Sequence, residues 1–271
     1  MKACAKYLFY FFTTIVLQGC GVETTEWDFE EGDNGKLVVE ALLSTEYKRQ
    51  EVRLSLSYND WNEEPTMVSG ASVSIGNGIE DILLEESPEE SGLYRSAEAV
   101  SLVPGILYQL NIEWQDKVYT ASNQMVYVFP ISPMGFQQVN DSDSMVLSFN
   151  TTGYSPTEQS MYVIDIDWTE LSGNEDSKAQ LRFYIFNSLD VSGVFKPAQE
   201  PVYFPKGSKV FIRKYGLNDG YADFLRALVM ETEWQGGLFD DVSSNLPSNI
   251  SNGGLGYFAV CAMRMDSLVA E

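Results

Sequence analysis

The sequence predicts a mainly all-β protein, with an N-terminal β-sandwich of immunoglobulin-like size and a C-terminal, mainly antiparallel β domain that carries one packed α-helix. Short apolar runs that alternate with polar residues recur along the chain, and glycine or proline turns separate them. Only the segment between Asn218 and Gln235 has the 3.6-residue period of an amphipathic helix. The chain has 271 residues, 44% of them hydrophobic, which is a normal composition for a globular protein of one or two domains.

Residues 1–19 are predicted to be a lipoprotein signal peptide. Lys2 and Lys6 precede an apolar run over residues 7–17, which is shorter than the ~20 residues that a membrane-spanning helix needs. The sequence LQGC that ends at Cys20 resembles the bacterial lipobox, in which the signal is cut before a cysteine that carries lipid. We therefore expect lipidation of Cys20 and attachment to a membrane by this lipid. The alternative is an ordinary signal peptide in which this cysteine has no role.

The next segment, residues 20–35, is predicted to be an acidic tether. It contains six acidic residues and few large apolar side chains, so it cannot bury enough apolar surface to fold by itself. Such a segment would hold the folded part of the chain away from the membrane.

Residues 36–128 have the pattern of a β-sandwich domain. Val52, Leu54 and Leu56 alternate with polar residues, which is typical of a half-buried strand. A hairpin is expected around Gln115 and Asp116, where two strand-like runs meet. About seven short strands with glycine and proline turns fit a sandwich. The clearest runs are 37–43, 52–58, 68–75, 92–94, 107–113 and 117–121.

We place the domain boundary at residues 129–133, which contain two prolines, because proline cannot donate to a β ladder. In the second domain, residues 129–271, strands are expected over 145–149, 160–168, 180–187, 209–214 and 257–263. Its helix is predicted over 219–235, with Asn218 or Asp219 as the N-cap and Gly236-Gly237 at its end. The helix face that we expect to pack on the sheet comprises Tyr221, Phe224, Leu225, Leu228 and Val229.

Charge and composition argue against several functions. The chain has a formal net charge of −22 and no histidine. The missing histidine removes the commonest general base, and the acidity argues against nucleic-acid binding. We expect no catalytic residue and no cofactor. We also expect no metal site, because the acid clusters lack the spacing of a calcium loop. Asp165 and Asp167 could form the carboxylate pair of a glycosidase, although a solvated strand face is what we expect.

The turn-rich segment 246–256 is the candidate functional loop, with Asn249, Asn252, Gly253 and Gly256 as its candidate residues. A phosphate-binding loop is not expected there, because the Lys-Ser/Thr pair of a P-loop is missing and a strand follows in place of a helix. Cys261 lies among small apolar residues and is expected to be buried. Aromatic residues next to loops favour a binding surface; examples are Trp61, Tyr127, Tyr203 and Trp234.

Several short motifs occur in order along the chain. They are KLVVE at 36–40, VSGASV at 68–73, GLYRS at 92–96, NISNG at 249–253 and GYF at 256–258. With the lipobox before them, they resemble an uncharacterised family of outer-membrane lipoproteins, domain of unknown function 4249. The resemblance implies export to the outer membrane of a Gram-negative bacterium and association with TonB-dependent transporters, and it implies no catalytic residues. Residues 68–74 also resemble the start of carboxypeptidase-regulatory-like sandwiches, which are non-catalytic modules.

These observations lead to one hypothesis and two alternatives. We expect a lipid-anchored, non-enzymatic accessory or binding protein at the outer membrane or its outer surface, which binds a transporter barrel, a ligand or both. The first alternative is a surface hydrolase of glycans or peptides that works with carboxylates alone. The second is an adhesin or a structural protein of the envelope.

Overall fold

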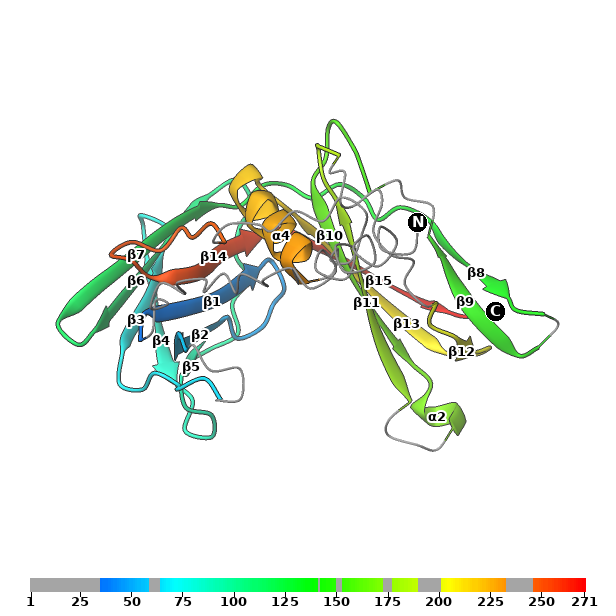
Figure 1. Ribbon diagram of the computed structural model, residues 1–271, viewed down its shortest axis with the longest axis horizontal. Coiled ribbons are helices and arrows are strands. Elements are labelled where there is room, and N and C mark those ends of the chain that lie inside the picture. The colour runs from blue at the N-terminus through cyan, green and yellow to red at the C-terminus, as the bar shows by residue number, and fades with distance from the viewer. Residues whose placement is uncertain are drawn as a thin grey trace, which may run out of the picture. The chain divides into compact units, whose positions relative to one another are not determined.

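The computed structural model describes residues 35–58, 64–140, 142–149, 153–172, 177–189, 201–232 and 246–271, all of which belong to one structural unit. Fifteen strands and two helices lie in these ranges, so the predicted mainly all-β fold is confirmed (Figure 1). Neither of these two helices is long and apolar enough to cross a membrane. The predicted signal peptide, Cys20 and nearly all of the tether lie outside the described residues.

An eight-stranded sheet contains most of the N-terminal half of the chain, with its strands in the order β14-β1-β2-β5-β4-β3-β6-β7. Seven of these strands lie between residues 37 and 124, which agrees with the predicted number. The sequence did not predict β4, because Leu84 is its only buried residue. The strands are β1 (Leu37–Ser44), β2 (Glu51–Leu56), β3 (Ser72–Gly76), β4 (Asp81–Glu86), β5 (Leu93–Ser96), β6 (Leu107–Trp114), β7 (Lys117–Gln124) and β14 (Leu255–Cys261).

One face of this sheet encloses a hydrophobic core. On β1 the side chains of Leu37, Val39 and Leu43 are buried, whereas Val38 and Leu42 are only partly buried. The same period of two recurs on β6 and β7, as expected for strands with one face in a core. All eight strands contribute to a single cluster of buried side chains.

The two edge strands of the sheet, β7 and β14, are joined by side chains and by the segment that precedes β14. The Val260 N–H of β14 donates to Asn123 Oδ1 on β7 (3.2 Å). The Ser251 N–H donates to the Thr120 carbonyl (2.8 Å), and the Thr120 N–H donates to Ser251 Oγ (2.7 Å). The sheet is thereby closed around its core, and the Thr120 N–H and carbonyl at the edge of β7 are satisfied.

Strand β14 pairs in parallel with β1, from Val38 opposite Leu255 to Ser44 opposite Cys261. A strand from residues 129–271 therefore completes the sheet formed by residues 36–128. The chain continues as β15 (Met263–Val269), which pairs with β13 in a different sheet. The buried strand predicted over 257–263 corresponds to β14, which is buried from Tyr257 to Cys261. It is not the last strand of the chain, as predicted, because β15 follows it. The sequence did not indicate β15, since that strand exposes most of its side chains and shows no apolar alternation.

The remaining strands form a four-stranded sheet, β11-β10-β13-β15, and a three-stranded sheet, β12-β9-β8. Tyr162 and Ile212 of the first sheet and Met145 and Phe204 of the second are buried in one cluster, so the two sheets share a core. The short strands β8 and β12 and the one-turn helix α2 were not predicted. The elements are β8 (Met134–Gln138), β9 (Ser144–Phe149), β10 (Ser160–Asp167), α2 (Thr169–Ser172), β11 (Lys178–Ile185), β12 (Phe204–Pro205) and β13 (Lys209–Gly216).

Helix α4 (Asp219–Thr232) confirms the predicted helix, whose expected end at residues 233–237 lies outside the described residues. Asn218 is the N-cap, since the Tyr221 N–H donates to Asn218 Oδ1 (2.9 Å). Cys261 is buried beneath the helix, as predicted, and burial raises the pKa of its thiol. The buried side of α4 packs against the outward face of β14, in a cluster that includes Tyr221, Leu225, Val229, Ala259 and Cys261.

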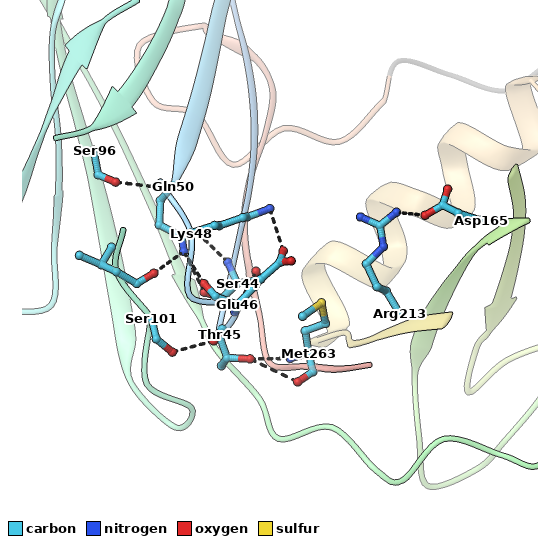
Figure 2. A network of polar contacts seen from close by, with 11 residues as sticks. Ser44, Thr45, Glu46, Lys48, Gln50, Ser96, Ser101, Asp165, Arg213 and Met263 are labelled. Carbon is cyan, nitrogen blue, oxygen red and sulfur yellow. Dashed lines mark hydrogen bonds and ion pairs between the residues drawn. The ribbon is translucent and has the colours of Figure 1, made fainter. Parts of the chain in front are cut away.

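Polar contacts connect the loop between β1 and β2 to the junction of β14 and β15 (Figure 2). The Met263 N–H donates to Thr45 Oγ1 (2.9 Å), which in turn donates to the Met263 carbonyl (3.3 Å). The buried Gln50 amide donates to the carbonyls of Ser44 (3.2 Å) and Val100 (2.8 Å). Because an unpaired buried amide costs about 1–3 kcal/mol, these bonds fix the shape of the loop that presents Thr45 to the strand junction.

Candidate functional site

Two hollows border helix α4, and Tyr257 of β14 lines both of them. The first, which we call the apolar groove, has a volume of about 880 Å³ and lies between α4 and β1. The second, which we call the amide pocket, has a volume of about 650 Å³ and lies at the N-terminal end of α4. Both volumes fall within the range of ligand sites, roughly 300–1,000 Å³.

One wall of the apolar groove is the face of β1 that points away from the core of the large sheet. The residues on the other face of β1 are buried in that core, so Val38 and Leu42 point into the groove. From the other wall, α4 presents Phe224 and Leu228, the part of the predicted apolar helix face that the sheet covers only partly. The rest of the apolar lining consists of Val39, Ala41, Tyr58, Leu93, Tyr221, Leu246, Leu255 and Tyr257.

Stacked aromatic rings form one wall of the groove. The Tyr257 ring centroid lies 5.3 Å from that of Tyr221 and 4.9 Å from that of Phe224, which are favourable distances for aromatic pairs. Burial raises the pKa of the Tyr221 and Tyr257 hydroxyls. Both therefore stay protonated, and this wall is uncharged at neutral pH.

Charged side chains lie at the rim of the groove. Arg53 pairs with Glu90 (2.7 Å) and Lys48 pairs with Glu46 (3.3 Å), so acids neutralise both basic groups. Glu40, on the outward face of β1, is exposed beside them. Since exposed ion pairs contribute only about 0–1 kcal/mol to stability, these groups set the charge of the rim more than they hold the fold.

The amide pocket gathers polar side chains from separate parts of the chain. Asn218 Nδ2 donates to Asn123 Oδ1 (2.6 Å), and Asn123 also hydrogen-bonds the Tyr257 hydroxyl. Gln159 Nε2 donates to Asp219 Oδ1 (2.7 Å). These residues come from β7, the loop before β10, the start of α4 and β14, so no local motif in the sequence could have indicated the pocket.

Two exposed aromatic side chains also line the amide pocket. Tyr127 is 75% exposed and Phe129 is 52% exposed. Their segment runs close to β13 at Gly216, where a Cβ atom would lie 2.9 Å from the Tyr127 carbonyl oxygen. Fully buried Lys214 secures the same segment, because its Nζ donates to the Pro130 carbonyl (2.9 Å). Of the four aromatic residues noted next to loops, Tyr127 lines a hollow and exposed Tyr203 lines neither hollow. Trp61 and Trp234 lie outside the described residues.

The residues of the predicted functional loop do not converge on one site. Asn249 contributes to closure of the large sheet, since its Nδ2 donates to the carbonyls of Phe258 on β14 (2.8 Å) and Ser122 on β7 (3.4 Å), and its Oδ1 accepts from the Phe258 N–H (2.9 Å). Asn252 and Gly253 form an exposed turn with φ values of 56° and 74°. Gly256 is the one candidate that lines the apolar groove, and none of the four lines the described amide pocket.

The two acids considered as a carboxylate pair lie away from both hollows. Asp165 accepts hydrogen bonds from Arg213 (Figure 2) and from Gln180 Nε2 (2.7 Å). The Thr169 N–H donates to Asp167 Oδ1 (2.9 Å), and hydrogen bonds from Thr169 lower the pKa of Asp167. In the described part of the chain, no three acidic or cysteine side chains gather in a way that could hold a metal ion.

Comparison with known proteins identifies a family and no activity. The family model described as a domain of unknown function (DUF4249) matches residues 22–267. No curated protein matches the chain. Among solved structures, the FN1–FN3 domains of chicken CNTN1 are similar at 13% identity and a TM-score of 0.25, over 66% of this chain and 60% of that one, a likeness too low to bear on fold or function. Because the family model spans most of the sequence, the chain belongs to the family of the domain of unknown function 4249.

Proposed function

We propose that the protein is a lipid-anchored, non-enzymatic binding component of the outer membrane, and that its apolar groove holds a segment of a TonB-dependent transporter. The observation that carries the proposal is the groove itself, an opening of about 880 Å³ walled by leucine, phenylalanine and tyrosine side chains. Aromatic and leucine surfaces left open on a folded protein mark interaction sites. The lipobox at Cys20 supports attachment to a membrane, and the family resemblance supports a TonB-dependent transporter as the partner.

The walls and rim of the groove favour a peptide segment with apolar side chains flanked by basic ones. Both edges of β1 are already paired, by β14 and β2, so a partner cannot add a strand there and must insert side chains. The rim offers exposed Glu40, while acids already neutralise Arg53 and Lys48. With a net charge of −22 on the whole chain, basic flanks would complement the groove.

Site-specific photocrosslinking in native membranes tests this proposal. A photoreactive amino acid at the position of Leu228, in the full-length chain, is expected to form an adduct with an outer-membrane barrel protein. The matched control is the position of Ile79, which is apolar and 92% exposed but lies outside the groove. The proposal is wrong if Leu228 yields no such adduct, or if both positions yield it equally.

A further inference from the structure

We propose that the amide pocket binds a neutral saccharide. This inference rests on the side chains around the start of α4 and does not depend on the occupant of the apolar groove. The pocket brings together three features: amide side chains, an exposed carboxylate and exposed aromatic rings, within a hollow of about 650 Å³. Each feature matches one part of a sugar ring.

The amide side chains match sugar hydroxyl groups. A hydroxyl group both donates and accepts hydrogen bonds, and a side-chain amide offers both functions on neighbouring atoms. Gln124, Gln159 and Asn187 line the pocket, and Gln124 and Asn187 are exposed. A site that can pair each hydroxyl also discriminates strongly against ligands that lack them.

The carboxylate adds a stronger acceptor at a fixed place. Asp219 is exposed, and its Oδ1 accepts a hydrogen bond from Gln159 Nε2 (2.7 Å). Its second oxygen can accept from a sugar hydroxyl, in the charge-assisted class of hydrogen bonds. The neighbouring Asn218 is held by bonds to Asn123 Oδ1 (2.6 Å) and to the Gln124 carbonyl (2.8 Å). Because these groups are already ordered, little side-chain entropy is lost when a ligand binds.

The aromatic rings can stack on the apolar face of a sugar. The face of an aromatic ring carries partial negative charge and attracts the weakly positive C–H groups of a pyranose. Tyr127 is 75% exposed. Its hydroxyl lies 3.2 Å from where a Cβ atom of Gly105 would be, so the ring edge rests against that turn. Phe129 offers a second ring along the same segment.

The charge of the lining disfavours anionic ligands. Two acids, Glu158 and Asp219, line the pocket, and the lining residues that the structure describes include no lysine or arginine. Lys214, which pairs with Glu158, is fully buried. Lys214 balances the charge of Glu158, but a phosphate, sulfate or uronic acid would still be repelled by exposed Asp219, and no described basic lining residue would attract it. A basic peptide is the competing ligand, and the test includes it.

Binding measurements on the full mature chain test the inference. The protein, in a detergent without a sugar head group, is screened on an array of neutral gluco-, manno-, xylo- and galacto-oligosaccharides, and trilysine serves as the peptide probe. Hits are titrated by calorimetry. We expect at least one neutral oligosaccharide to bind. The Tyr127→Ala and Asp219→Asn substitutions should each raise the dissociation constant of that oligosaccharide by about tenfold or more.

Tyr47→Ala is the matched control, because Tyr47 is 77% exposed and lies outside the pocket. This variant should bind the oligosaccharide with the same affinity as the unmodified chain. If Asp219→Asn lowers the melting temperature, Gln124→Ala takes its place, since that side chain is exposed. The inference is overturned if no neutral oligosaccharide binds, if Tyr127→Ala and Tyr47→Ala bind equally, or if trilysine binds more tightly than every sugar.

Discussion

Gly256 lies where β14 meets β1, and its φ of +82° places it in the left-handed region. A Cβ atom at this position would lie 2.1 Å from the Val39 carbonyl oxygen, far inside contact distance. The backbone of β1 cannot easily move away, because it is paired on both edges. We predict that Gly256→Ala lowers the free energy of unfolding by about 4 kcal/mol or more, as measured by urea denaturation.

Gly253 provides the control for Gly256. Its φ of +74° is similar, but a Cβ atom there would meet nothing within 4 Å. Gly253→Ala should therefore cost only the strain of a left-handed residue, about 1–2 kcal/mol. Equal losses in the two variants would show that backbone conformation, and not the close approach to Val39, determines the effect.

Glu86 links stability to pH through a single carboxylate. It accepts a hydrogen bond from the Gly70 N–H (2.9 Å), which is the main reason that its pKa lies below the ordinary 4.5. Since the folded pKa is lower than the unfolded one, ionised Glu86 stabilises the fold above the unfolded pKa, and this effect is lost as pH falls through the folded pKa. Glu86→Gln should thus be less stable than the unmodified chain at pH 7.

The pH dependence separates this effect from lost packing. Thermal melts of both proteins between pH 7 and pH 3 should show the difference shrinking below about pH 4.5. A difference that stays constant over this range would mean that the carboxylate charge has no part in it.

At the level of elements, alternation and turn chemistry explain which strands could be predicted. In the predicted hairpin, Gln115 and Asp116 have φ values of 48° and 58°, which fit a tight turn between twisted strands. Helix α4 was predictable because its apolar residues recur at helical spacing. The missed strands β4 and β15 have few buried residues, so their pairing partners, and not their own pattern, make them strands.

The candidate sites were harder to predict than the elements. The apolar groove joins Val38 to Leu228, and the amide pocket joins Asn123 to Asn218. Residues so far apart in sequence leave no local signal. The loop at 249–256 did have a recognisable pattern of turn residues. These residues serve the fold, because Asn249 helps to close the large sheet and Gly256 lets β14 lie close to the Val39 carbonyl of β1.

Helix α4 and β14 together protect the thiol of Cys261, which gives a probe of the helix. Leu225 is 5% exposed in the same cluster, and Leu225→Ala should destabilise that packing by about 2–4 kcal/mol. In a chain that starts at residue 21, Cys261 is the only thiol. We predict slow labelling of Cys261 by a disulfide reagent in the unmodified protein, because burial raises the pKa of the thiol, and faster labelling in Leu225→Ala.

Asp223→Ala is the control on the opposite side of the helix. The Asp223 side chain is 61% exposed and pairs with Arg226, one turn away. Its removal should leave the labelling rate unchanged. If Leu225→Ala also labels at the original rate, the helix is not what shields Cys261.

At the scale of the whole molecule, the large sheet depends on residues far downstream of its first seven strands. Phe258 of β14 is fully buried in the core of that sheet, and Val260 is 1% exposed in the same cluster. The loop around Thr45 also binds the backbone of Met263. Residues 36–128 therefore supply seven strands but leave an unfilled core and two open edges.

We predict that a polypeptide of residues 36–128 alone does not fold, and that a peptide of residues 246–262 added in trans restores a cooperative thermal melt. The peptide would supply β14 together with Asn249 and Ser251, which bond Ser122 and Thr120 of β7. The same peptide with Gly256→Ala should fail to restore the melt, because it cannot approach the Val39 carbonyl. A cooperative melt of residues 36–128 by themselves would show instead that the sequence-based boundary marks an independent domain, to which β14 adds only an edge.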